Sequence, residues 1–112
     1  MTTYSTQDLT RSSLENITTG GYETVAASQT DQVMGGAGAK GDYIVGILVV
    51  PATVSPGAIS IKDGSGSAIT VFTGGTLVTV TPFYIPLGMT ATTNWKVTTG
   101  SNVSVIAFGR FT

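Results

Sequence analysis

Short runs of β-branched and aromatic residues, cut by turn residues, constrain the fold of this chain more than any other feature. From Glu23 onward such runs recur roughly every 8–12 residues, and the breaks fall at Gly, Pro, Asn and Asp. After residue 22 no stretch of ordinary helical length repeats its apolar residues with a helical period. The pattern argues against an α/β fold. It predicts an all-β chain: a single antiparallel β-sandwich or small barrel of about six to eight strands, with an extended N-terminal arm.

Two of the runs are apolar on both faces. Residues 42–52 read DYIVGILVVPA, and residues 102–111 read NVSVIAFGRF. A strand with one face in water alternates apolar and polar residues, so a strand that is apolar on both sides suits a central position covered on both faces. We therefore predict that both are central strands and that Pro51, which has no N–H, ends the first one. Residues 23–28 and 31–34 are shorter, weaker candidates.

Two hairpins are predicted. In residues 58–72 two alternating runs flank Asp63-Gly64-Ser65-Gly66, a typical hairpin turn. Residues 93–99 and 102–111 flank the turn sequence TGSN, which predicts a second hairpin at the end of the chain. Between them, residues 76–81 alternate Val with Thr and are expected to be extended, followed by a second alternating set beyond Pro82.

Residues 1–22 are polar and end in Gly20-Gly21. We interpret them as an N-terminal arm, with a short helix around residues 6–16, and residues 23–112 as the β-sandwich domain. Such an arm is either disordered or ordered by a neighbouring subunit. On the second interpretation its apolar residues are the candidate partner-binding residues: Tyr4, Leu9, Leu14 and Ile17.

The composition narrows the function classes. Charged residues make up 10% of the chain and the net charge is −1, against about 25% charged residues in typical soluble domains. So few charges favour a protein that is packed against other chains. No basic run is present, so we expect no nucleic-acid partner. The longest apolar run, residues 43–52, is too short for a membrane helix of roughly 20 residues, so we expect no membrane partner. Without Cys or His, neither a metal site nor a cofactor is expected.

The stretch GAGAKG, residues 36–41, matches the G-x-G-x-x-G pattern of dinucleotide-binding folds. In those folds the glycines follow a strand and open a helix whose N-terminus binds phosphate. Here they precede a strand, and the acid about 20 residues on would be Asp63, in a hairpin turn. We predict a loop that permits close packing, with Lys40 exposed and no nucleotide bound.

No catalytic constellation emerges, and we predict that the protein is not an enzyme. Asp63 is better explained as a turn residue and Lys62 as a solvated strand residue. Trp95 could stack on a sugar with help from the tyrosines, although a single Trp on a strand is more often a core residue. The acids are scattered and form no paired motif: Asp8, Glu15, Glu23, Asp31, Asp42 and Asp63.

Four segments within residues 41–111 carry a family resemblance: GDYIVGILVVPAT, ISIKDGSGSAITVF, YIPLGM and WKVTTGSNVSVIAFGRF. In these the chain resembles small virion structural proteins of tailed bacteriophages. The resemblance implies a capsid decoration, or cement, protein on the capsid exterior that binds the major capsid protein and stabilises the head shell through arm and sheet contacts. Closed symmetry implies a homo-oligomer, with a trimer expected at local threefold positions. No catalytic residues are carried over.

Two alternatives stay open. One is a tail or fibre-associated binding module that recognises host surface glycan, motivated by Trp95, Tyr22, Tyr43 and Tyr84 on a sandwich fold. The other is a hydrolase, which rests only on the chance that two of the six acids meet in space.

Overall fold

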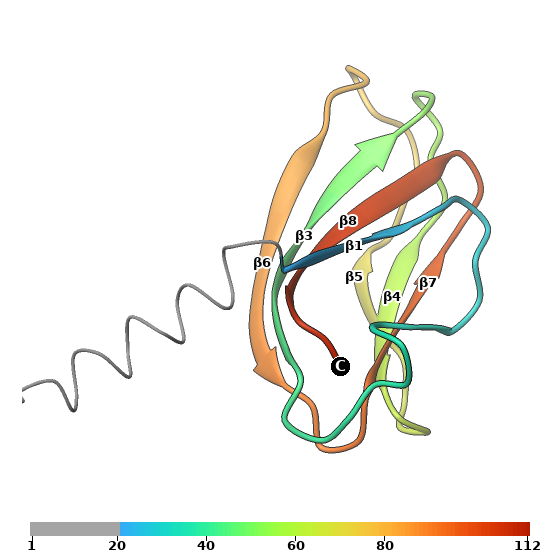
Figure 1. Cartoon of the computed structure of the whole chain (residues 1–112). Coiled ribbons are helices and arrows are strands. Elements are labelled where there is room, and N and C mark those ends of the chain that lie inside the picture. The colour runs from blue at the N-terminus through green and yellow to red at the C-terminus, as the bar shows by residue number, and fades with distance from the viewer. Residues whose placement is uncertain (1–20) are drawn as a thin grey trace, which may run out of the picture.

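The computed structural model describes residues 21–112, which form two four-stranded antiparallel sheets packed face to face (Figure 1). The predicted all-β sandwich is confirmed. The candidate partner-binding residues Tyr4, Leu9, Leu14 and Ile17, and the short helix expected around residues 6–16, lie outside the described residues. The strands are β1 (Tyr22–Val25), β2 (Gln32–Val33), β3 (Tyr43–Pro51), β4 (Ile59–Asp63), β5 (Ile69–Phe72), β6 (Phe83–Thr90), β7 (Trp95–Thr99) and β8 (Val103–Arg110).

The first sheet has the order β1-β8-β3-β6, so the two strands predicted to be central, β3 and β8, are central. Their pairing spans the full length of both strands, from Tyr43 opposite Arg110 to Pro51 opposite Val103. Pro51 is the last residue of β3, as its missing N–H predicts. A register shift between Ile44 and Gly46 inserts one extra residue, which bends the strand.

The second sheet has the order β2-β7-β4-β5. The hairpin predicted over residues 58–72 is confirmed as β4 paired with β5. At its turn Gly66 donates its N–H to the carbonyl of Asp63 at 3.0 Å. Asp63 is thus a turn residue, as predicted.

The hairpin predicted at the end of the chain is wrong. β7 pairs with β2 and β4 in the second sheet, whereas β8 pairs with β1 and β3 in the first. Both edges of β8 already have partners, so the turn after Thr99 carries the chain across the sandwich. Val97 and Val105 therefore belong to opposite sheets, and both contribute to the core between the sheets.

The alternation of Val and Thr over residues 76–81 does not form a strand, although an extended segment was expected there. The segment is a loop, and β6 begins only at Phe83. β6 is an edge strand, which tolerates the missing N–H of Pro86. Residues 76–81 belong to the connection from β5 in one sheet to β6 in the other, so their backbone crosses between the layers instead of pairing along either sheet.

The core lies between the sheets and is built from the inward residues of both. Its members are almost entirely buried: Val25, Met34, Ile44, Ile47, Val49, Ile59, Ile61, Ala91, Trp95, Val97, Val103, Val105 and Ala107. Each buried Val or Ile contributes roughly 1.5–3 kcal/mol relative to an exposed position. Within residues 21–112 we find no helix with the length and apolarity needed to cross a bilayer.

Candidate functional site

The outward side of the first sheet is apolar. Successive side chains of a strand point to opposite faces, so the buried residues of β1, β3, β6 and β8 identify which of their neighbours point away from the core. We call the resulting surface the apolar face. Its large side chains are Tyr22, Tyr43, Leu48, Val50, Tyr84, Pro86, Ile106 and Phe108.

The strand register gathers these side chains into rows across the sheet. Ile106 lies opposite Leu48, which lies opposite Tyr84. Tyr84 and Phe108 are in contact, with ring centroids 6.2 Å apart and planes at 57°. Tyr84 also lies against Gly46: a Cβ at that glycine would overlap the Tyr84 hydroxyl and ring. Glycine at this position therefore lets an aromatic ring lie flat on the sheet.

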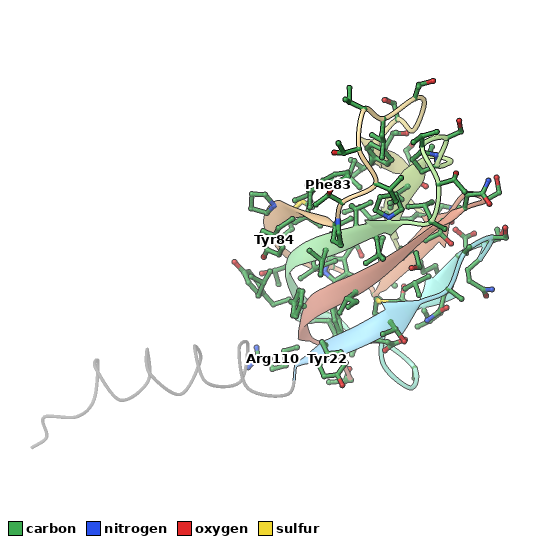
Figure 2. The ribbon with its side chains drawn as sticks, turned by 90° about the horizontal axis from the view of Figure 1, so that it is seen from above. Tyr22, Phe83, Tyr84 and Arg110 are labelled. Carbon is green, nitrogen blue, oxygen red and sulfur yellow. The ribbon has the colours of Figure 1, made fainter. Side chains whose placement is uncertain are left out.

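The apolar face remains partly open to solvent. Tyr22 is 60% exposed and Tyr84 is 46% exposed. Figure 2 shows Tyr84 on β6 and, at the end of the molecule where β1 begins, Tyr22 beside Arg110. Arg110 is the one charged residue at the outward positions of this sheet among the described residues. Leu48, Val50, Ile106 and Phe108 are half-buried by their neighbours alone.

The outward side of the second sheet is different. β4 and β7 place Ser60, Lys62, Lys96 and Thr98 there, with Ser60 opposite Thr98 and Lys62 opposite Lys96. Lys62 forms an ion pair with Asp31 at 3.2 Å, and its hydrogen bond is the main cause that lowers the pKa of that carboxyl. Lys62 is thus a solvated strand residue, as predicted. One sheet presents a polar face to water, and the other presents the apolar face.

A second apolar feature lies at one end of the sandwich, where residues 52–58 and 73–82 form two neighbouring loops (Figure 1). Neither loop contains a charged residue. Leu77 donates its N–H to the carbonyl of Val54 at 2.7 Å, and Gly75 donates to Pro56 at 3.1 Å, so the loops support each other. Val78 is 98% exposed. We call these two loops the valine tip.

The glycine-rich stretch binds its own chain. The N–H groups of Ala37 and Gly38 donate to the carbonyl oxygen of Thr112 at 3.2 and 2.8 Å. Gly38 has φ of 74°, a conformation that favours glycine. Lys40 is exposed, as predicted. The backbone amides that suggested an anion cradle therefore point at the backbone oxygen of Thr112, two residues beyond the end of β8.

Asp42, directly after this stretch, is a buried carboxylate that the sequence did not single out as structural. It is 2% exposed. Its Oδ2 accepts N–H bonds from Ala39 and Thr112, both at 3.1 Å, and its Oδ1 accepts the Thr112 hydroxyl at 3.0 Å. Its carbonyl accepts the indole N–H of Trp95 at 3.2 Å. Asp42 thus holds the loop, the core and the end of β8 together.

Asp63 holds another turn. Its carboxylate accepts the N–H of Thr92 at 2.8 Å, the N–H of Thr93 at 2.9 Å and the N–H of Asn94 at 3.2 Å, and it also accepts the Thr92 hydroxyl at 2.8 Å. The backbone hydrogen bond from Thr92 is the largest cause that lowers the pKa of Asp63. The sequence identified the turn but not this contact, because the partner turn is far away along the chain.

The aromatic residues proposed for sugar stacking separate into two groups. Trp95 is 3% exposed and belongs to the core, which confirms the interpretation favoured for a single Trp on a strand and contradicts a role in sugar stacking. Tyr22, Tyr43 and Tyr84 all point outward on the apolar face. Within residues 21–112 no group of three or more acidic side chains is placed to hold a metal ion.

No family model, curated protein or solved structure matches the chain.

Proposed function

We propose that the protein is a structural virion component: a capsid decoration protein that binds and stabilises the head shell of a tailed bacteriophage. The apolar face is the observation that carries this proposal. A sandwich that leaves two aromatic rings exposed and a row of aliphatic side chains half-buried on one sheet is suited to burial in a larger assembly. Its second sheet has the polar face expected of a solvated surface.

The charge distribution supports the same role. An interface core is depleted of charge and enriched in aromatic residues. The apolar face has that composition, with Arg110 at its corner. The valine tip offers a second uncharged contact, whose neighbouring loops are joined by backbone hydrogen bonds and therefore need little ordering on binding.

The test uses purified phage heads that lack the protein. Wild-type protein should bind at a fixed stoichiometry in co-sedimentation and raise the temperature at which the heads release DNA. Tyr84→Asp places a charge on the apolar face and should abolish binding. Ser60→Asp is the matched control, because it places the same charge on a strand of the polar sheet, and it should bind like wild type.

Equal occupancy of the heads by the Tyr84→Asp and wild-type proteins would refute the role of the apolar face. Absence of the protein from purified virions by mass spectrometry would refute the virion assignment.

A binding module for host surface glycan is the second candidate, favoured by Tyr22, Tyr43 and Tyr84 on one sheet face. Tyrosine rings combine an apolar body with a polar tip, which suits a sugar surface. A glycan array with the assembled protein separates the two functions. Binding that is lost in Tyr22→Ala and Tyr84→Ala supports this candidate, and no binding to any glycan excludes it.

A further inference from the structure

The apolar face needs an occupant, and no element within residues 21–112 supplies one. The sandwich has two layers, and the apolar face is the outer side of one of them (Figure 1). β3 and β8 carry apolar residues on both sides, the pattern of strands covered on both faces. One cover is the core. The other must come from outside the described residues. This inference rests on the proposed function in treating the apolar face as buried in the assembled state; a neighbouring copy covers the face there, so Tyr84→Asp blocks head binding by breaking the oligomer that binds.

The size of the face argues against simple pairing with an identical face. Four strands spaced by about 4.8 Å and about seven residues at about 3.4 Å give an area of roughly 450 Å². A standard interface buries about 800 Å² on each partner. Two flat faces alone would therefore form a weak contact. A long segment of chain that lies over the face could also bury residues at the edges of the face.

The chain offers such a segment in residues 1–20, which precede Gly21. Extended, 20 residues reach about 65 Å, which is several times the width of roughly 19 Å across four strands.

The direction of the chain at Gly21 favours a neighbouring copy over the same subunit. The carbonyl of Gly21 accepts the N–H of Gly109 at 2.8 Å, so Gly21 continues the pairing of β1 with β8. At Gly21 the chain therefore still runs along the strand axis, in the plane of the sheet.

The composition of the segment matches the face. After Met1 its apolar residues are the predicted partner-binding residues Tyr4, Leu9, Leu14 and Ile17; its acids are Asp8 and Glu15, and its one basic residue is Arg11. Arg110, at the corner of the face beside Tyr22, has no ion-pair partner among residues 21–112. We propose that residues 1–20 of one copy pack on the apolar face of a neighbouring copy, so that exchanged N-terminal segments hold a homo-oligomer together.

Cysteine cross-linking tests the exchange directly, because the chain contains no cysteine of its own. Full-length Leu14→Cys protein is mixed with full-length Tyr84→Cys protein, and the mixture is treated with a bismaleimide reagent. We expect a covalent dimer that contains one chain of each variant. A double variant that gives only an intramolecular cross-link, with no product from the mixture, would overturn the exchange between copies.

Sedimentation of the full-length chain without phage heads provides a second, independent test. Leu14→Asp combined with Ile17→Asp should shift the oligomer toward monomer, with at least a tenfold weaker association. Ser13→Asp combined with Thr18→Asp adds the same charge at neighbouring positions and should leave the association unchanged. Equal effects of the two double variants, or a wild-type protein that is monomeric, would overturn the proposal.

These outcomes are separable from the proposed function. If the protein exchanges its N-terminal segments in solution but does not bind heads, this inference stands and the decoration role is refuted. If the wild-type protein binds heads and the Leu14→Asp and Ile17→Asp double variant still forms the oligomer, the decoration role stands and this inference is refuted.

Discussion

Replacement of Asp42 tests whether one buried carboxylate holds the glycine-rich loop and the end of β8 in place. In Asp42→Ala the N–H groups of Ala39 and Thr112 and the Thr112 hydroxyl lose their acceptor. The N–H of half-buried Ala39 then lacks a partner, and an unsatisfied buried polar group costs about 1–3 kcal/mol, whereas the groups of exposed Thr112 can bond to water. Removal of a buried charge returns part of this cost. We therefore expect the free energy of unfolding to fall by about 1–3 kcal/mol.

Asp42→Asn is the matched control. Its amide oxygen can still accept both backbone N–H groups at the Oδ2 position, and its NH₂ group can donate to the Thr112 hydroxyl, which also acts as an acceptor. The loss is then limited to the charge assistance of these bonds, about 1 kcal/mol or less.

Urea unfolding at neutral pH measures both variants against wild type. For a domain of this size 3 kcal/mol corresponds to a fall in Tm of roughly 12–24 °C. Hydrogen exchange at the Ala39 amide should accelerate in Asp42→Ala and change little in Asp42→Asn. Equal destabilisation by the two substitutions would refute the reasoning, because the charge and not the set of accepted bonds would then be the source of stability.

Three further predictions concern the turn, the sheet and the tip. The hydrogen bonds from Thr92 and Thr93 hold the folded pKa of Asp63 below 3.8, so its contribution is present above that pH and is lost as pH falls through the folded pKa. Asp63→Asn should therefore be less stable than wild type at about pH 6, and in urea unfolding this difference should shrink as the pH falls below 3.8; a constant difference would contradict this. Gly46→Ala forces Tyr84 and the Ile85 carbonyl aside and should cost about 1–3 kcal/mol, whereas Gly36→Ala meets nothing and should change the urea midpoint little. Val78→Asp should leave stability within about 0.5 kcal/mol of wild type, because the side chain is 98% exposed; a larger loss would mean that the valine tip is packed.

Much of the fold could be predicted because it depends on local patterns. The period-two alternation identified the strands, and apolar residues on both faces placed β3 and β8 at the centre of a sheet. The turn chemistry at Asp63 gave the β4–β5 hairpin. The same reasoning failed at residues 76–81, where the alternation is present but the segment crosses from one sheet to the other, and at the turn after Thr99, where a good turn sequence connects two sheets.

The candidate site could be predicted only in part. The sequence indicated which strands have apolar residues on both sides, and it selected Tyr22, Tyr43 and Tyr84 as a possible group. It did not show that these tyrosines share one face or that Trp95 is buried in the core, away from that face. Both facts depend on register and on strand order across the sheet.

The sequence by itself determined the class of this protein: an all-β chain with few charges, two strands that require cover on both faces, and a glycine-rich stretch that precedes a strand instead of a helix. Alternation tells which side chains share one side of a strand. The tertiary structure decided which strands are neighbours, that the glycine-rich amides bind Thr112, and that the apolar residues of four strands join into one open face. Those outcomes result from competition among long-range pairings, which no local pattern encodes.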